Sequence, residues 1–216
     1  MEDLTELITK IPPTMILCTL IWLSLFTISH LKNAAKDPDH FDKLSNTHCL
    51  IGMSLAIISI YINDETIFSE EVVISWCLGY FCADLVDCVI RKDVMFLVHA
   101  LIGFSLLYCC YCHFYDLRGG SWGYFVEVST PFLNYWKKSK TKRSFGVFLA
   151  SFILIRLVYT PIFLLWKLDV NGGLSSNTFA IVASGAFYLL NVVWAFKATG
   201  LYLKYDEGKS KSKKNE

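Results

Sequence analysis

Long apolar runs are the feature that most constrains this chain of 216 residues. A helix needs about 20 predominantly apolar residues to cross the roughly 30 Å hydrocarbon core of a bilayer. Seven runs approach or reach that length: Ile11 to Leu31, His48 to Ile62, Val72 to Ile90, Val94 to Tyr115, Ser121 to Trp136, Ser144 to Trp166 and Phe179 to Leu203. Only 18% of the residues are charged, against about 25% in soluble domains. The sequence therefore predicts an all-α membrane protein of about seven transmembrane helices, without a soluble domain.

The fifth run is the weakest span because it contains Glu127 and Pro131. Cytoplasmic loops of membrane proteins carry an excess of Lys and Arg. If all seven runs cross and the carboxyl terminus lies in the cytosol, only Lys10, Arg118 and Lys167 among the loop cations fall on the opposite side. The bias becomes much weaker if the fifth run does not cross. We therefore expect seven spans with the amino terminus outside the cytosol.

The two ends of the chain indicate where the protein resides. The first run follows an acidic flank and no small-residue cleavage site follows it, so a retained span is expected instead of a signal peptide. The last four residues, Lys213 to Glu216, resemble the dilysine retrieval signal by which coat proteins return membrane proteins to the endoplasmic reticulum. Two adjacent lysines, Lys213 and Lys214, also fit an ordinary solvated end of a lysine-rich tail. The net charge of +1 disfavours a nucleic-acid partner.

The eight cysteines lie in or beside the apolar runs. They are expected to be small buried side chains and not a disulfide framework. The segment Cys109-Cys110-Tyr111-Cys112-His113 fits the C-x-x-C-H pattern of covalent haem attachment. Because it lies inside an apolar run, helix packing is the favoured interpretation, and neither a cofactor nor a metal is predicted.

Ionisable side chains inside the spans are the candidates for chemistry. A charge at the bilayer centre costs several kcal/mol, so such residues normally face a bundle interior or a water-filled cavity. The candidates are Asp84, Asp87, His99, Glu127, Arg156 and Lys197. At 1.5 Å per residue, four of them lie within roughly 5 to 11 Å of the cytosolic boundary, and Glu127 lies within about 14 Å. Two interpretations follow: a polar cavity open to the cytosolic leaflet, or interhelical hydrogen bonds that hold the bundle together.

Asp84 and Asp87 are three residues apart and so share one face of a helix, with Arg91 one turn beyond Asp87. Each carboxylate could have a functional role or a structural one. In the structural role the carboxylates are partners of Arg156 or His99. Pro131 removes a backbone hydrogen bond from the fifth run and is expected to shape that helix.

Three segments together resemble the TLC domain, a membrane family that includes the ceramide synthases and the translocating-chain-associating proteins. They are Gly79-Tyr80-Phe81-Cys82-Ala83-Asp84-Leu85-Val86-Asp87, Phe96-Leu97-Val98-His99 and Glu127-Val128-Ser129-Thr130-Pro131-Phe132-Leu133-Asn134. The closing Asn191-Val192-Val193-Trp194, followed by Lys197, is similar to the last span of the non-synthase members. The resemblance implies a TLC domain over residues 41–204, preceded by a first span within 1–40 and followed by a cytosolic tail at 205–216. It also implies that the last six spans enclose a lipid tunnel with a polar cytosolic mouth.

The resemblance implies a protein of the endoplasmic reticulum membrane that binds, senses or regulates lipids in homeostasis or trafficking, without catalysis. The alternative is a ceramide-synthase-like N-acyltransferase that uses acyl-CoA and a sphingoid base, which makes sphingolipid or acyl-CoA a candidate partner. In the synthases two adjacent histidines open the catalytic motif, where this chain has His99-Ala100. The later aspartates of that motif align with Glu127 and Thr130, so one acid is retained and one is lost.

Acyl transfer to an amine needs a base, and His99 with Glu127, Asp84 or Asp87 would have to supply it. Four further polar residues are expected either at the lipid site or in hydrogen bonds between helices: Thr130, Asn134, Arg156 and Lys197. A seven-helix receptor is a third class, which the short loops and the lack of an Asn-Pro-x-x-Tyr sequence in the last run disfavour. The sequence assigns no oligomeric state.

Overall fold

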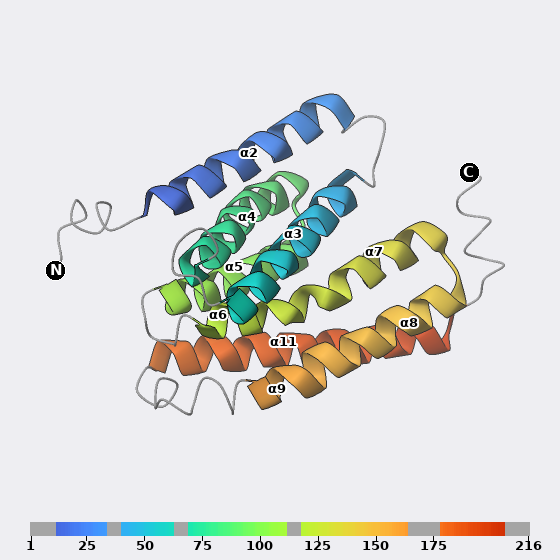
Figure 1. Cartoon of the computed structure of the whole chain (residues 1–216). Helices are drawn as coiled ribbons and strands as arrows, with labels where there is room; N and C mark the ends of the chain where they lie inside the picture. The colour runs from blue at the N-terminus through green and yellow to red at the C-terminus, as the bar shows by residue number, and fades with distance from the viewer. Residues whose placement is uncertain (1–11, 34–39, 63–68, 112–117, 164–177, 206–216) are drawn as a thin grey trace.

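The computed structural model describes residues 12–33, 40–62, 69–111, 118–163 and 178–205, and these ranges contain helices and no strand. The elements are α2 (Pro13–Asn33), α3 (His40–Ile62), α4 (Glu70–Arg91), α5 (Val94–Tyr111), α6 (Arg118–Tyr124), the 3₁₀ turn η1 (Phe125–Val128), α7 (Ser129–Ser139), α8 (Lys142–Phe152), the π-helical η2 (Ile153–Tyr159), α9 (Thr160–Phe163) and α11 (Thr178–Leu203). Figure 1 shows them as one helical bundle. The predicted all-α class is confirmed.

Within the described ranges six helices are long and apolar enough to cross a membrane. They are α2, α3, α4, α5, the continuous α8–η2–α9 helix and α11. The predicted fifth span is helical too, as the α6–η1–α7 run over residues 118–139, but it is not among these six. We call this run the polar helix, because its buried side includes Ser121, Ser129 and Asn134, while Phe132 and Tyr135 on its other side are exposed.

The α6–η1–α7 run is anchored at both ends of the bundle. Near its start the Ser121 hydroxyl donates to the carboxylate of Glu70, the first residue of α4. Near its end Lys137 pairs with Asp42 in the first turn of α3, with 2.8 Å between Nζ and Oδ1. Consecutive helices α3 and α4 run in opposite directions (Figure 1), so these two anchors lie at opposite ends. The run therefore extends through the full depth of the bundle.

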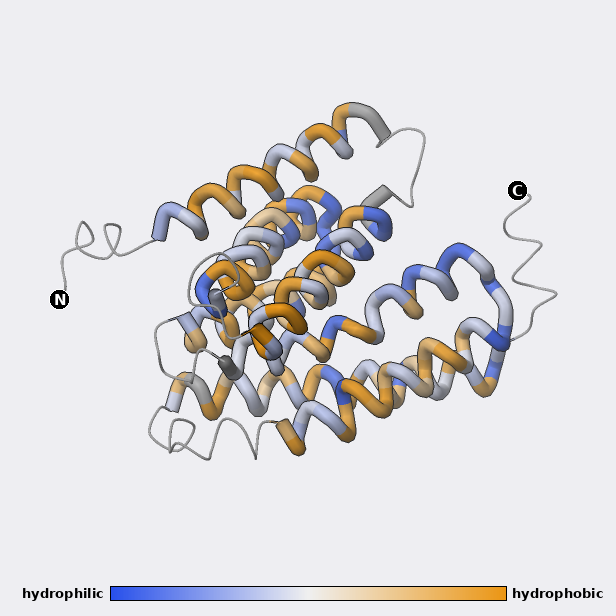
Figure 2. The backbone as a smooth tube through the Cα atoms, in the orientation of Figure 1, coloured by the Kyte–Doolittle hydropathy of each residue, from blue (hydrophilic) through white to orange (hydrophobic). Residues whose placement is uncertain are grey.

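Hydrophilic segments concentrate at the end of the bundle that holds the α4–α5 and α7–α8 connections (Figure 2). The first connection is a short turn, in which Lys92 caps α4 in the left-handed conformation with φ 57°. The Asp93 carboxylate then accepts from the Phe96 N–H at the start of α5, at 3.3 Å. We call this end the polar end.

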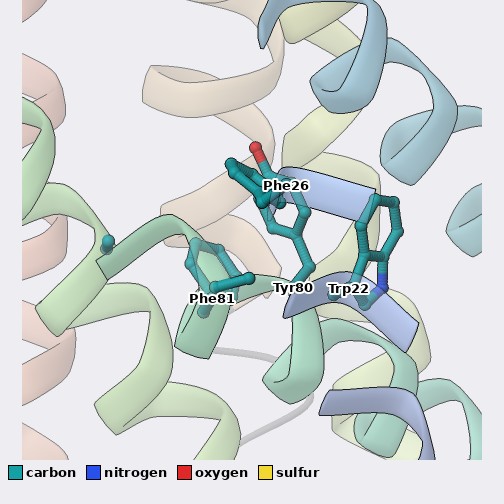
Figure 3. Close-up of a cluster of buried hydrophobic side chains, with 6 residues drawn as sticks. Trp22, Phe26, Tyr80 and Phe81 are labelled. Carbon is teal, nitrogen blue, oxygen red and sulfur yellow. The ribbon is translucent and has the colours of Figure 1, made fainter. Parts of the chain in front are cut away.

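The first helix is fixed on α4 by aromatic packing and by a close backbone contact. Buried Trp22 and Phe26 of α2 pack on Tyr80 and Phe81 of α4 (Figure 3). A Cβ on Gly79 would lie 2.7 Å from the backbone carbon of Cys18, so only glycine permits this approach of the two helices. The central helix α4 is consequently buried along most of its length and carries its two aspartates inside the bundle.

Candidate functional site

An ion pair between Arg156 and Glu127 lies at the centre of the bundle. Arg156 Nη2 is 3.2 Å from Glu127 Oε1, and the two side chains are only 4% and 14% exposed. The guanidinium also donates to Ser129 Oγ at 2.9 Å and to Asn191 Oδ1 at 3.3 Å. Thr130 Oγ1 donates to the second oxygen of Glu127 at 2.8 Å. Such hydrogen bonds are required if a buried charge pair is to offset its desolvation.

Two departures from α-helical geometry place these partners. Arg156 lies in the π-helical η2, where an extra residue per turn rotates the side chains that follow, and such turns often occur at functional sites. Glu127 lies in the 3₁₀ turn η1, directly before the α7 turn that contains Pro131. Proline has no N–H to continue the helical ladder, which accounts for the change of geometry next to it.

Asp87 belongs to a second polar cluster at the polar end. Its carboxylate accepts from Arg91 Nε at 2.6 Å and lies 2.8 Å from His30 Nε2, and Asp87 is 1% exposed. Neither Asp87 nor Asp84 forms an ion pair with Arg156 or His99 among the described residues. Asp87 instead has Arg91 and His30 as its partners, and the guanidinium of Arg156 pairs with Glu127.

His99 of α5 is buried without a hydrogen-bond partner for its Nδ1 atom among the residues that the structure describes. Its ring lies beside Trp194 of α11, with 5.1 Å between ring centroids, and beside Phe81, at 6.2 Å. A buried polar atom normally has a partner, and exceptions concentrate at functional sites. This histidine is thus placed against aromatic walls with one nitrogen unpaired.

Two neighbouring cavities inside the bundle share three lining residues, Phe81, His99 and Glu127. The larger cavity has a volume of about 380 Å³. The smaller one, about 90 Å³, extends away from the polar end between α5, α6, α9 and α11. We call the two together the passage, and the smaller cavity its narrow arm.

The larger cavity has a charged lining toward the polar end, which we call the polar mouth. Its charged residues are Asp42, Asp84, Arg91, Lys137 and Lys197, and the central Arg156 and Glu127 line the cavity deeper in the bundle. Asp84 and Lys197 form no ion pair with other described residues. A polar mouth that leads into an apolar arm matches an amphipathic ligand.

The remaining predicted residues separate into two groups. Thr130, Asn134 and Lys197 all line the larger cavity, and Asn134 also donates to Asn46 Oδ1 of α3 at 2.8 Å. Lys213 and Lys214 lie outside the described residues. No group of three or more His, Cys, Asp or Glu side chains able to hold a metal occurs in the described part of the chain.

Sequence reasoning missed two histidines that organise the interior. His30 contacts Asp87, and His48 is stacked on Tyr80 at 3.7 Å between ring centroids, while the Tyr124 hydroxyl lies 2.9 Å from its Nε2. Both histidines occur near the ends of apolar runs. An ionisable residue at such a position was a usable signal, because burial there requires a partner.

These features define a multi-pass helical membrane protein with a polar core and an internal passage. The family model for the TLC domain matches residues 14–199, which is most of the chain. The chain therefore belongs to the TLC-domain family. The matched range begins within α2 and so includes the first helix. Comparisons with curated proteins and with solved structures gave no match.

Proposed function

We propose that this TLC-domain protein binds a membrane lipid by one hydrocarbon chain in the passage, with the headgroup at the polar mouth, and thereby senses or regulates membrane lipid composition. The observation that carries the proposal is the junction of a charged cavity with an apolar arm at Phe81, His99 and Glu127. A site of this shape accepts a polar group and a chain in one orientation.

Electrostatics supports this orientation. A charged side chain that faces a bundle interior is tolerable where water or a polar ligand group reaches it. Asp84 and Lys197 line the mouth and are not committed to ion pairs among the described residues. Both are therefore positioned to interact with a headgroup that enters from the cytosolic leaflet, and the distribution of Lys and Arg supports a cytosolic orientation of the polar end.

A non-catalytic role is favoured by the environment of Glu127. Its two carboxylate oxygens are engaged by Arg156 and Thr130, so the carboxylate is held by a cation and is a poor base. No described carboxylate is hydrogen-bonded to His99. A general base normally has a partner that orients it.

The acyltransferase alternative has one observation in its favour, the unpaired Nδ1 of His99 at the junction of the two cavities. Microsomes that contain the protein would then make ceramide from labelled acyl-CoA and a sphingoid base, and His99→Gln would abolish the product. Synthesis no greater than in microsomes that lack the protein supports the binding role.

The binding role is tested by filling the junction of the two cavities with a larger side chain. The purified protein in phosphatidylcholine nanodiscs is labelled with a photoreactive fatty acid, and unlabelled oleic acid serves as competitor. His99→Trp should fill the junction and remove saturable labelling. The matched control Phe196→Trp adds a similar ring at a residue that is 76% exposed and outside the passage, and it should label like the wild type. Equal, unsaturable labelling of both variants and the wild type would contradict the proposal.

The proposed location is the endoplasmic reticulum membrane. The support for it is the dilysine end at Lys213 and Lys214, together with the charge distribution that places the tail in the cytosol. Coat proteins are the partners that this signal would engage.

A further inference from the structure

The narrow arm of the passage has an almost wholly apolar lining, which comes mostly from α5, α6, α9 and α11. Leu106, Leu107 and Cys110 of α5 face Phe163 of α9 and Phe187 of α11. Glycines of α6 form part of the wall between them. A hydrocarbon chain gains no hydrophobic advantage in such an arm over the bilayer, because lipid tails are as apolar as these side chains. Any selection among chains here must therefore be steric.

The glycines that line the arm differ in the space around them. A Cβ on Gly103 would lie 2.8 Å from the Phe81 ring, and one on Gly120 would lie 2.7 Å from the Ile74 side chain. A side chain at either position would therefore force its neighbour to move. A Cβ on Gly123 would meet only the Phe163 ring, at 3.5 and 3.6 Å, which is ordinary van der Waals contact. The backbone at Gly123 is helical, so other residues are compatible with it.

We propose that Gly123 determines the length of hydrocarbon chain that the protein accepts, because its missing side chain leaves the space beside Phe163 that the end of the chain occupies. The inference rests on the proposed function, with the headgroup at the polar mouth. A larger residue at position 123 shortens the accepted chain, and removal of the Phe163 ring lengthens it. The ligand class is a lipid with one hydrocarbon chain that is long enough to reach past His99.

The test is competition binding with the full-length protein in phosphatidylcholine nanodiscs. A photoreactive fatty acid is the tracer, and saturated fatty acids from decanoic to eicosanoic acid are the competitors. The variants are Gly123→Leu, Gly123→Ala and Phe163→Ala. Gly185→Leu is the matched control, because it adds the same side chain to an exposed glycine of α11 with nothing within 4 Å of its Cβ.

Gly123→Leu should weaken competition by the longest acids by about tenfold or more, the effect expected of overpacking, and leave decanoic acid unchanged. Gly123→Ala should give a smaller shift in the same direction, and Phe163→Ala the opposite shift. Gly185→Leu should behave like the wild type. Suppose that the wild type binds the tracer saturably and that folded Gly123→Ala and Gly123→Leu have the same dependence of competition on chain length as the wild type. That result would overturn the inference and leave the proposed function standing. A wild type without saturable binding would overturn both.

Discussion

The central ion pair predicts a large and specific loss of stability when one partner is removed. Arg156→Met leaves the Glu127 carboxylate buried without its cation, and it also removes the donors to Ser129 and Asn191. Breaking a buried pair costs about 3 to 5 kcal/mol, because one uncompensated charge remains. The double variant Arg156→Met with Glu127→Gln removes both charges, so its loss should be well below the sum of the two single losses.

The control is the pair between Lys137 and Asp42, whose side chains are 35% and 23% exposed. Water already solvates these charges, so Lys137→Met should cost only about 0 to 1 kcal/mol. Free energies of unfolding are measured by titration from mild detergent into denaturing mixed micelles. The reasoning would be refuted if Arg156→Met lowered the free energy of unfolding no more than Lys137→Met does. It would also be refuted if the loss in the double variant equalled the sum of the two single losses.

Three further outcomes are expected. Tags at the two termini should lie on opposite sides of the membrane under selective permeabilisation, and two cytosolic tags would mean that the polar helix at 118–139 does not cross. Replacement of Lys213 and Lys214 by Ser should let the protein reach later compartments on microscopy, and unchanged localisation would contradict the retrieval signal. Asp84→Asn and His99→Gln should each lose lipid binding while the melting temperature stays within a few degrees of the wild type. Asp87→Asn should melt at a clearly lower temperature, because it breaks a buried cluster. Equal melting temperatures of the Asp84→Asn and Asp87→Asn variants would refute this distinction.

The apolar runs predicted the helices well because crossing a bilayer sets both the length and the composition of a span. Even the fifth run, with Glu127 and Pro131, was predicted within a few residues of its bounds, 118–139. Its position between α3 and α8 was not predicted. Hydropathy reports how apolar a helix is on average, and a helix with a buried polar face gives the same signal as a weak span.

The partners within the site were less predictable than its depth. Counting residues along each span predicts that Asp84, Asp87 and Lys197 lie near one end of the bundle, because depth follows from rise per residue. It did not show that Arg156 pairs with Glu127. That contact depends on how each helix is rotated, and the π-helical turn at Arg156 changes the rotation in a way that residue spacing does not reveal.

The most direct test of lipid binding in the passage is to locate the far end of the bound chain. A fatty acid with a photoreactive group at its terminal carbon is crosslinked to the protein in nanodiscs, and the labelled peptides are sequenced by mass spectrometry. The account predicts adducts on residues of the narrow arm, above all on Phe163 and Cys110, and their loss in the His99→Trp variant. Adducts spread over lipid-facing side chains such as Leu189 and Phe196, with none in the arm, would contradict it.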